Sequence, residues 1–392
     1  MPSDSNDKLL KELERGLLEL EAKNQRRSLA EIHGVNLCSN DYLGLAESPA
    51  LKEAAIAAMQ GSAHCGGTGS RLLSGNSAAW EELEEEFAEF AGTEAALYFG
   101  SGYAANLGLL TSLLGKGDVV FSDALNHASL IDGIRLSGAR RVIVPHMDLD
   151  RLETALAEHA GESCRKIIVT ESVFSMDGDV ADVQMLAKLA EKYGAALIVD
   201  EAHATAVHGP QGRGIVAGAA LEKGVLATVH TCGKALASAG AFVCGSNTLR
   251  DHLINQARTF IFSTAMPPAM ARQIRAALTL ARGMDAERAA LRERAWQFAA
   301  GLREESWDLS GSTTQIVPAI VGSNEQATSA AEYLQCEGFA VRAIRPPTVP
   351  EGRARLRFSL TAKISAEELA RLHQCMAMWR ERRESSTKAA GR

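Results

Sequence analysis

The 392-residue sequence lacks the marks of several protein classes. It has no run of 18 apolar residues, so no membrane-spanning helix is expected. Its N-terminal stretch, MPSDSNDKLLKELERGLLELEAKNQRR, is charged throughout and lacks the apolar centre of a secretory signal. Basic residues are not in excess, because 41 Lys and Arg stand against 48 Asp and Glu and the net charge is −7. A sequence-independent nucleic-acid binder needs a basic face, so no nucleic-acid partner is expected either.

Cysteine is also scarce, and its spacing fits neither a metal site nor a disulfide framework. The sequence has 7 cysteines, an odd number, and no two of them stand in C-x-x-C spacing. We therefore predict no metal site. Reduced thiols are typical of a cytoplasmic enzyme, so we predict a cytoplasmic location and leave a periplasmic one open. The cysteines are Cys38, Cys65, Cys164, Cys232, Cys244, Cys336 and Cys375.

Short apolar runs alternate with helical segments in the middle of the chain. Several runs are apolar at nearly every position, which is typical of strands covered on both faces in a mainly parallel sheet. We therefore predict an α/β fold in which helices wrap one large sheet. The predicted strands span residues 94–99, 118–123, 140–145, 166–172, 196–202, 225–230 and 241–246.

The flanking segments predict two further parts. Residues 1–30 have the pattern of an amphipathic helix, followed by irregular chain to about residue 44. After residue 283 a long charged helix precedes the predicted strands TQIVPAIVG and RARLRFSLT and a final helix. We predict an N-terminal helix and arm over 1–44, a large domain over 45–282, and a smaller α+β domain over 283–392.

Serines mark two helix starts in the predicted large domain. Ser48 precedes Pro49, a residue that suits the first helical position, and Ser77 precedes the acidic helix AAWEELEEEFAEFA. We predict that both serines act as N-caps, and that Gly92 ends the second helix.

Three predicted strands end in polar residues. IVDEAHA places Asp200 at one strand end with His203 three residues later, and HTCGK places Lys234 just beyond another. Parallel sheets bind ligands at the carboxyl ends of their strands. Alone, each residue is compatible with a solvated loop or a helix cap, but together they form a candidate site. The third strand end, VTESVFSMDGD, adds Glu171, Ser172, Ser175 and Asp177.

Lys234 stands in unusual surroundings. The segment HTCGKALASAG places it among small residues between two apolar runs, although lysine is seldom buried without a partner. A partly desolvated lysine has a lowered pKa and becomes a nucleophilic amine that can form a Schiff base. Asp200 could hold a pyridinium nitrogen protonated. These are parts of a pyridoxal-phosphate (PLP) site.

A phosphate cradle is also predicted. YFGSGYAANLGLL has the pattern of a strand, a glycine turn and a helix, so the N–H groups of Gly102 and Tyr103 would face an anion. The hydroxyls of Ser175 and Thr231 could add donors. The same turn also fits a dinucleotide G-x-G-x-x-A pattern, with Asp123 where a ribose-binding acid would stand. That alternative leaves Asp200 and Lys234 unexplained.

In these and other motifs the chain resembles the α-oxoamine synthases, which are fold-type I PLP enzymes of the class II aminotransferase group. The resemblance covers nearly the whole chain, from residue 36 to the last helix. It implies a fold-type I transferase with a large, mainly parallel seven-stranded sheet and a smaller C-terminal domain. It also implies a homodimer with sites at the interface. The motifs, in order, are SNDYLGL, GSGYAAN, NHASLIDG, TESVFSMDGD, VDEAHATAVHGPQGRG, HTCGKALASAG, FIFSTAMPP and AIRPPTVPEGRARLRFSL.

Within that family, SNDYLGL, MPP and IRPPTVP are most similar to the member that condenses L-alanine with a pimeloyl thioester in biotin biosynthesis. The resemblance leaves open whether the donor is pimeloyl-CoA or pimeloyl-acyl carrier protein. One alternative is a related synthase that uses glycine or serine with another acyl-CoA. Another is a catalytically silent homologue that acts as a binding protein, against which the intact Lys234, Asp200 and His203 argue.

The resemblance also implies roles for single residues. Lys234 would form the imine with the cofactor, and Asp200 would pair with its pyridinium nitrogen. His203 would hydrogen-bond the phenolic oxygen, and His127 would stack on the ring and contact substrate, although alone it would be taken for a packing or capping residue. These are the expected catalytic residues. The further expected cofactor contacts are Gly102, Tyr103, Ser175 and Thr231.

Other residues are expected to bind the substrates. Arg357 matches the arginine that pairs with the amino acid carboxylate, a role that suits a planar bidentate guanidinium. Asn40 would lie near the amino acid. Thr348 and either Arg27 or its neighbour Arg26 match acyl-substrate contacts, and the two N-terminal arginines could equally be a solvated charge pair. We expect Arg353 and Arg355 to be surface residues and His230 to be structural.

The chain departs from the family pattern in two places. Ala237 and Ala241 stand where the family often has glycines after the lysine, and Ser172 replaces a more usual glycine. The first departure bears on the shape of the loop around substrate.

Overall fold

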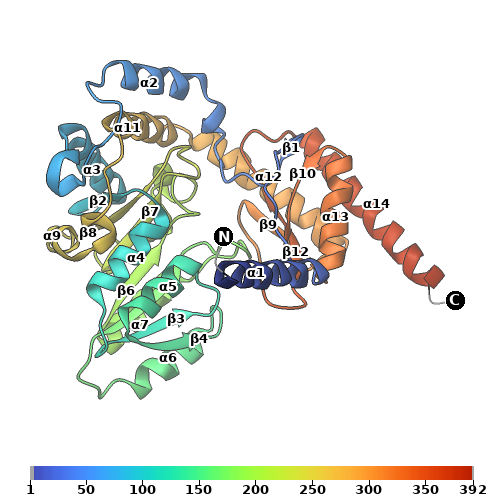
Figure 1. Cartoon of the computed structure of the whole chain (residues 1–392), viewed down its shortest axis with the longest axis horizontal. Helices are drawn as coiled ribbons and strands as arrows, with labels where there is room; N and C mark the ends of the chain where they lie inside the picture. The colour runs from blue at the N-terminus through green and yellow to red at the C-terminus, as the bar shows by residue number, and fades with distance from the viewer. Residues whose placement is uncertain (1–3, 391–392) are drawn as a thin grey trace.

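The computed structural model describes residues 4–390 and is built round a seven-stranded sheet (Figure 1). The strand order is β2-β8-β7-β6-β5-β3-β4, and only β8 runs antiparallel to its neighbours. The predicted α/β fold with a mainly parallel sheet is confirmed. The strands are β2 (Ala95–Phe99), β3 (Val119–Asp123), β4 (Arg140–Val144), β5 (Lys166–Glu171), β6 (Ala195–Asp200), β7 (Ala227–Thr231) and β8 (Ala241–Gly245).

Helices cover both faces of this sheet, which explains why its strands are apolar at nearly every position. All six residues of β5 are buried, and successive side chains enter different cores. Ile167 packs with α4 and α5, while Ile168 packs with α6 and α7. The helices of this large body are α2 (Pro49–Gln60), α3 (Ala78–Ala91), α4 (Gly102–Leu113), α5 (Ala128–Ser137), α6 (Leu149–Glu158), α7 (Val183–Tyr193), α8 (Ile215–Gly218), α9 (Asn247–Gln256), α10 (Arg258–Ile261) and α11 (Pro268–Arg282).

Both predicted N-cap serines occupy the N-cap position, but only one of them accepts a capping hydrogen bond. Ser48 Oγ accepts a hydrogen bond from the Leu51 N–H at the start of α2, as predicted. Ser77 occupies the N-cap position of α3, but its hydroxyl accepts no capping bond and is buried without a hydrogen-bond partner. Gly92 ends α3 in the left-handed conformation, as predicted.

A smaller body, called the small body below, packs beside the large one. It contains a three-stranded sheet in the order β11-β12-β9. The N-terminal arm joins it, because β1 (Val35–Asn36) pairs in parallel with β10 (Phe339–Ala340). The predicted domain limits at residues 44 and 282 remain predictions. The other elements of the small body are α12 (Asp285–Glu304), β9 (Ile316–Gly322), α13 (Asn324–Cys336), β11 (Ala343–Ile344), β12 (Ala354–Ser359) and α14 (Ala366–Ala390).

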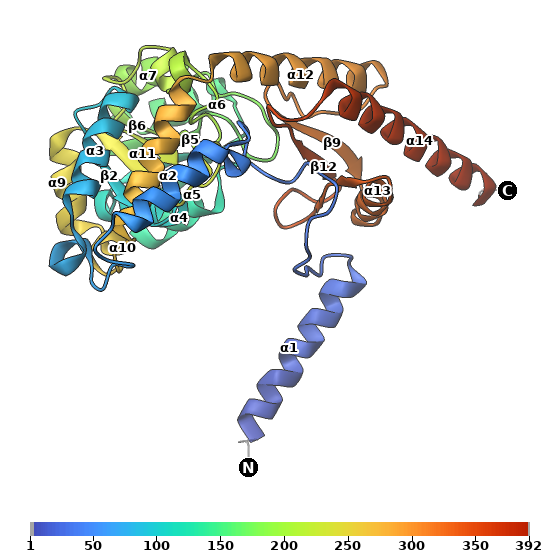
Figure 2. The same cartoon turned by 90° about the horizontal axis from the view of Figure 1, so that it is seen from above.

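The N-terminal helix α1 (Asp4–Ala22) is shorter than the predicted 1–30 and projects away from both bodies (Figure 2). The prediction for residues 1–3 lies outside the described part of the chain. Within residues 4–390, no helix combines the length and apolar character needed to cross a membrane. Several leucines of α1 are exposed: Leu9, Leu10, Leu13, Leu17, Leu18 and Leu20.

Candidate active site

A cavity of about 260 Å³ lies at the carboxyl ends of the central strands of the large sheet. The strand order puts the ends of β5, β6 and β7 side by side, which is where parallel sheets bind ligands. Residues far apart in sequence therefore meet there. Of the predicted cofactor residues, the cavity is lined by Gly102, Tyr103, His127, Asp200, His203, Thr231 and Lys234.

Asp200, the last residue of β6, is buried and firmly held. Its Oδ2 accepts a hydrogen bond from Asn106 Nδ2 at 2.7 Å, and its Oδ1 accepts one from the Ala202 N–H at 2.9 Å. Asn106 also donates to Ser129 Oγ at 2.9 Å. Two donors thus fix the carboxylate, which faces the cavity. Sequence reasoning missed Asn106, because nothing in the α4 pattern separates a buried amide from ordinary helix polarity.

Lys234 follows β7 and lies at the cavity wall. Burial lowers the pKa of its ammonium, although the carboxylates of Asp200 and Glu171 act in the opposite direction. No hydrogen bond or ion pair holds its Nζ within the described chain. The amine is therefore more easily deprotonated than an ordinary lysine, as its surroundings in the sequence predicted.

His203 is buried and linked to the N-terminal arm. Its Nδ1 lies 2.7 Å from the hydroxyl of Tyr42, which lies 3.0 Å from Asn40 Oδ1. Burial lowers the pKa of His203 well below its ordinary value, and the nearby Lys234 and Arg357 act in the same direction. His203 is therefore neutral near pH 7. Tyr42 stands in the SNDYLGL motif, but its role could be found only from this contact.

His127 both caps α5 and faces the cavity. Its Nδ1 accepts a hydrogen bond from the Ser129 N–H at 3.3 Å and lies 2.8 Å from Ser129 Oγ. The ring nitrogen that caps the helix also fixes the plane of the imidazole. Burial lowers the pKa of His127, so its ring is neutral near pH 7. His127 can therefore cap α5 and face the cavity at the same time.

The start of α4 lies at one end of the cavity, where the sequence predicts an anion cradle. Ser101 caps the helix by accepting from the Ala104 N–H at 3.0 Å, which leaves the preceding N–H groups without partners inside the helix. A Cβ at Gly102 would lie 2.7 Å from Thr231 Cγ2, so only glycine admits this close approach. Thr231 Oγ1 lies 3.3 Å from the Ala202 carbonyl. These donors surround one end of the cavity.

Arg357 reaches the site from β12 of the small body. Its Nε donates to the Ser175 carbonyl at 2.5 Å, and its other nitrogens donate to Asn40 Oδ1 at 3.2 Å and to Ser359 Oγ at 2.5 Å. Asn40 and Arg357, both expected to lie near the amino acid, are thus in direct contact. Ser175 itself does not line the cavity; its N–H donates to Glu171 Oε2 at 3.3 Å.

The residues predicted to bind the acyl substrate are only partly brought together. Arg27 NH2 donates to Thr348 Oγ1 at 3.2 Å, which joins two segments more than 300 residues apart. Arg26 instead forms an exposed ion pair with Glu21 at 2.7 Å. The structure therefore separates the two neighbouring arginines and places Arg27, rather than Arg26, beside Thr348.

The model of the aminotransferase class I and II family matches residues 32–375. The chain belongs to this family. An 8-amino-7-oxononanoate synthase from Geobacter sulfurreducens is 49% identical over 347 residues, which is 88% of each chain.

Solved structures of family members are similar throughout. The 8-amino-7-oxononanoate synthase of Francisella tularensis gives a TM-score of 0.78 at 28% identity and covers 90% of this chain and 99% of that one. A serine palmitoyltransferase from S. paucimobilis with a bound PLP-myriocin aldimine gives a TM-score of 0.86 at 26% identity. The match covers 94% of this chain and 96% of that one. The predicted fold-type I resemblance is confirmed.

The donor set of this aminotransferase-family site suits PLP. The Lys234 amine, whose pKa is lowered, can react with an aldehyde, and the buried carboxylate of Asp200 can pair with a ring nitrogen. The start of α4, with the neighbouring hydroxyl of Thr231, can bind a phosphate. The absence of a Cβ at Gly102 lets this helix start lie close to Thr231, since a Cβ there would lie 2.7 Å from Thr231 Cγ2. Within residues 4–390, no group of acids, histidines or cysteines has the arrangement of a metal site.

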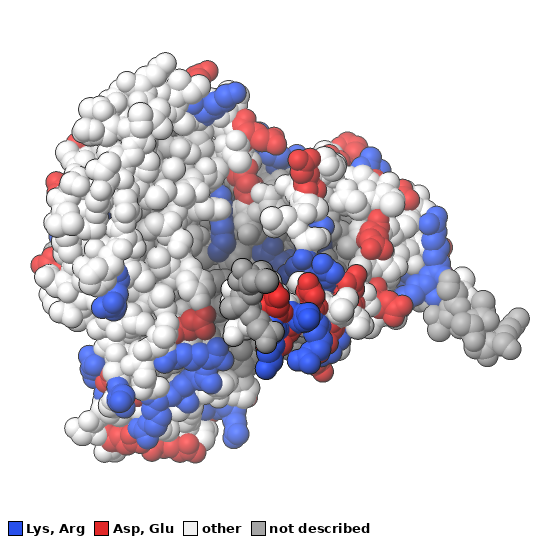
Figure 3. All heavy atoms as spheres, in the orientation of Figure 1, with Lys and Arg blue, Asp and Glu red and all other residues white. Residues whose placement is uncertain are grey.

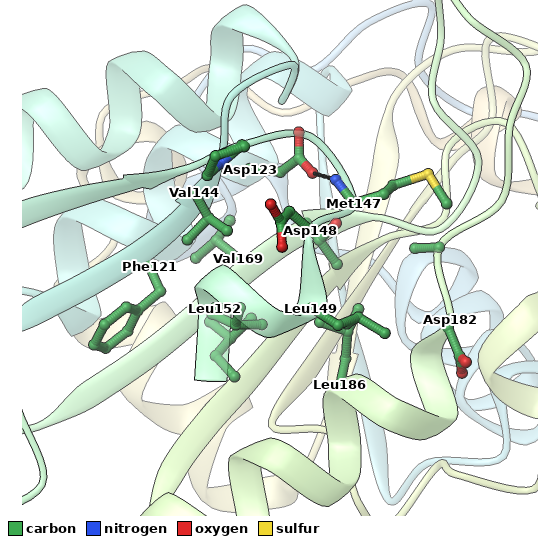
Figure 4. Close-up of a pocket in the computed structure, with 14 residues that line it drawn as sticks. Phe121, Asp123, Val144, Met147, Asp148, Leu149, Leu152, Val169, Asp182 and Leu186 are labelled. Carbon is green, nitrogen blue, oxygen red and sulfur yellow. Dashed lines mark hydrogen bonds between the residues drawn. The ribbon is translucent and has the colours of Figure 1, made fainter. Parts of the chain in front are cut away.

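The dinucleotide alternative fails at Asp123. That carboxylate accepts from the Met147 N–H at 2.9 Å (Figure 4). It also accepts from the Leu125 N–H at 2.8 Å and pairs with His146 Nδ1 at 2.9 Å. Its oxygens are therefore occupied and unavailable to a ribose. Figure 4 shows Asp123 at the edge of a separate apolar pocket, between the sheet, α6 and α7.

Burial tests the expectations about three other positions, Arg353, Arg355 and His230. Arg355 is not a surface residue: its side chain is 2% exposed and pairs with Asp177 Oδ1 at 2.6 Å. Strand alternation alone could not reveal this partner from another body. Arg353 is partly exposed and pairs with Asp308 at 2.8 Å. His230 is structural as expected, buried between Thr205 and Thr228.

Glu171 is a cavity residue that sequence reasoning noted but did not assign. It is the last residue of β5 and is paired in register with Asp200 on β6. Its Oε1 is buried without a hydrogen-bond partner. Burial and the neighbouring Asp200 raise the pKa of Glu171 to about 8. A second, protonated acid therefore stands beside Asp200.

The two departures after Lys234 have different consequences. Ala237 adopts φ of 45°, a left-handed conformation that glycine takes more easily. Ala241 begins β8 and pairs with Thr231 and Phe99 in ordinary strand geometry. Only the first alanine occupies a position where glycine would relieve backbone strain.

Proposed function

We propose that this chain catalyses the decarboxylative condensation of L-alanine with a pimeloyl thioester, the 8-amino-7-oxononanoate synthase reaction of biotin biosynthesis, with PLP as cofactor. The observation that carries the proposal is the convergence of Lys234, Asp200 and His203 on one cavity beside an anion cradle. The 49% identity to a synthase of that name supports the substrate class. Likeness in fold does not, because a serine palmitoyltransferase superposes equally well.

PLP, when bound, supplies an electron sink for a carbanion at the amino acid Cα. Lys234 would hold the cofactor, and its amine, once free, would take the Cα proton, since burial lowers its pKa. Asp200 would pair with the ring nitrogen, and its bonds from Asn106 and Ala202 keep the carboxylate in place. His203 would hydrogen-bond the phenolic oxygen.

Arg357 would bind the amino acid carboxylate. The new bond would form between the alanine Cα and the thioester carbonyl carbon, and the C–S bond would break. The thiolate would leave and take a proton from water. The carboxylate then departs as CO2, and Lys234 returns its proton to Cα. His127, whose ring plane is fixed by its bond to Ser129, would flank the ring and restrict the approach to Cα.

The acyl donor would approach near Arg27 and Thr348. Arg345 also lies at this end of α1, with hydrogen bonds to the backbone of Asn24 and Arg26. Figure 3 shows basic side chains in the hollow between the two bodies, and basic and acidic side chains mixed beside α1. This local positive charge suits the phosphates of CoA or the acidic surface of an acyl carrier protein, despite the net charge of −7.

A homodimer is part of the proposal. Leu73 and Phe262 are 85% and 71% exposed, which is unusual for large apolar side chains. A cavity of about 250 Å³ connects this region with the cradle, since Ser101 and Thr264 both line it. A second copy covering Leu73 and Phe262 would therefore lie next to the phosphate site. A cytoplasmic location is proposed as well, supported by seven free cysteines.

A substrate panel tests the proposal. Purified chain loaded with PLP is given L-alanine, glycine or L-serine, each with pimeloyl-CoA and with pimeloyl-acyl carrier protein, and the condensed product is measured. The proposal expects product with alanine and a pimeloyl donor. Product with only glycine or serine would favour the related synthases, and no product with any pair would favour the silent homologue.

A further inference from the structure

Two arginines on one face of β12 have opposite electrostatic surroundings. Arg355 and Arg357 are two residues apart in this strand, so their side chains point to the same side. Arg355 NH1 pairs with Asp177 Oδ1 at 2.6 Å. Arg357 donates only to uncharged oxygens, and no carboxylate pairs with it within the described residues. One arginine is neutralised, and the other keeps its charge for an incoming carboxylate.

Residues 175–178 of the large body, called the Asp177 loop below, are hydrogen-bonded to the small body at all four positions. Each residue accepts at least one hydrogen bond, so the loop and β12 cannot shift separately. The Ser175 carbonyl accepts from Arg357 at 2.5 Å, the Met176 carbonyl from Arg355 at 3.3 Å, Asp177 Oδ1 from Arg355 and Ser310, and the Gly178 carbonyl from the Thr313 N–H at 3.1 Å and Thr314 Oγ1 at 2.8 Å.

Burial makes the ion pair of Arg355 with Asp177 sensitive to the loss of either partner. The side chains of Arg355 and Asp177 are 2% and 6% exposed. A buried charge that loses its partner is strongly destabilised, so each holds the other in one position. The neighbouring pair of Arg353 with Asp308 is 41% and 52% exposed, so loss of either partner costs much less, although Arg353 also donates to Ser310 Oγ, the hydroxyl that donates to Asp177.

We propose that Asp177 is a positioning residue for the amino acid substrate: by neutralising and fixing Arg355, it sets the position of Arg357 and leaves Arg357 as the unpaired guanidinium at the site. The inference rests on the proposed function, in which Arg357 binds the substrate carboxylate. Asp177 does not line the cavity. It acts through β12 on one side and through the Ser175 carbonyl on the other.

The test uses holoenzyme and three variants. Asp177→Asn removes the charge at nearly constant shape. Asp177→Asn with Arg355→Gln removes both charges and restores a neutral pair. Asp308→Asn is the matched control, because it breaks the exposed pair on the adjacent arginine. The measurements are L-alanine affinity from the change in cofactor absorbance, KM for pimeloyl-CoA, PLP affinity and Tm.

We expect Asp177→Asn to weaken L-alanine binding about tenfold while PLP affinity and KM for pimeloyl-CoA change less than twofold. The double variant should recover most of the alanine affinity, and Asp308→Asn should change none of the three. A lowered Tm with unchanged alanine affinity in Asp177→Asn would overturn the proposal and leave a merely structural pair. If Asp177→Asn does not fold, the double variant decides: alanine affinity near wild type supports the proposal, and a tenfold loss overturns it.

Failure of the proposed function gives a different result. If wild-type holoenzyme binds glycine or serine but not alanine, the substrate assignment is wrong, and the Asp177 variants are then tested with the amino acid that binds. Since every amino acid has the same carboxylate, the same tenfold loss is expected. If no amino acid binds to the wild type, both proposals are overturned.

Discussion

The hydroxyl of Tyr42 lies 2.7 Å from Nδ1 of His203, although the two residues are 161 positions apart. The same hydroxyl lies 3.0 Å from Asn40 Oδ1, which Arg357 contacts from the other side. The N-terminal arm thus connects the residue proposed to bind the substrate carboxylate with the histidine proposed to contact the cofactor. The Tyr42 hydroxyl therefore links His203 to Arg357 through Asn40.

Tyr42→Phe tests this connection. The variant removes one hydroxyl and leaves His203 Nδ1 buried without a partner, which costs about 1–3 kcal/mol. We expect PLP affinity to fall by roughly tenfold and L-alanine affinity to fall as well. Fluorescence titration of the apoprotein with PLP measures the first effect. Unchanged affinity for both ligands would show that the phenol only fills space.

Glu171 predicts a pH dependence of stability. Its pKa is raised to about 8 in the folded chain, so between pH 4.5 and 8 the folded state holds a proton that the unfolded chain releases. The stabilising contribution is complete below pH 4.5 and is lost as pH rises to about 8. We expect the wild type to lose on the order of 3 kcal/mol more than Glu171→Gln across this window.

Urea unfolding of the apoprotein at pH 5, 6.5 and 8 measures that difference. Glu171→Gln keeps the size of the side chain and cannot titrate, so it is the appropriate comparison. Parallel pH profiles of the two proteins would show that Glu171 is not protonated in the folded state.

His146 predicts a second pH dependence, at higher pH. Burial opposes its charge, but hydrogen bonds with Asp123 and Asp179 raise the pKa of His146 to about 10. Its stabilising contribution is therefore complete below pH 6.5 and is lost as pH rises through about 10. His146→Leu leaves two carboxylates without their shared cation and should destabilise the chain by about 3 kcal/mol at pH 7.

Tm measured from pH 6.5 to 10 checks this second prediction. The difference between the wild type and His146→Leu should shrink steadily as the pH rises. A difference that stays constant would mean that packing, rather than charge, accounts for the loss.

Ala237 and Ala241 predict opposite responses to glycine. Ala237→Gly should stabilise the chain by about 1 kcal/mol, because it relieves a left-handed alanine at φ of 45°. Ala241→Gly should destabilise it by about 0.5–1 kcal/mol, because the residue is buried within β8. Chemical unfolding of the two variants side by side provides the comparison. Stabilisation by both, or by neither, would contradict the strain assigned to Ala237.

The fold and half of the site follow from local sequence patterns. Apolar runs located all seven strands of the large sheet within two residues at each end, because strands buried on both faces exclude polar residues. The strand order then brought Asp200 and Lys234 to one cavity, since parallel strands end at the same edge. Residues at strand ends could thus be predicted without knowing their partners.

The partners of those residues could not be predicted in the same way. Asn106 and Tyr42 contact Asp200 and His203 across 94 and 161 residues, and no local period encodes such distances. Arg355 was expected at the surface, because the strand pattern does not show that Asp177 of the other body neutralises it. Tertiary contacts between charged or polar groups had to be seen in the structure.

The proposed chemistry depends on Lys234 as the residue that carries the cofactor. The most direct measurement is borohydride reduction of the PLP-loaded chain, which converts an imine into a stable amine, followed by mass spectrometry of its peptides. We predict one pyridoxyl modification, on Lys234, and a Lys234→Ala variant that lacks both the modification and the imine absorbance. Modification of a different lysine, or a Lys234→Ala variant that keeps the absorbance and the condensation activity, would contradict it.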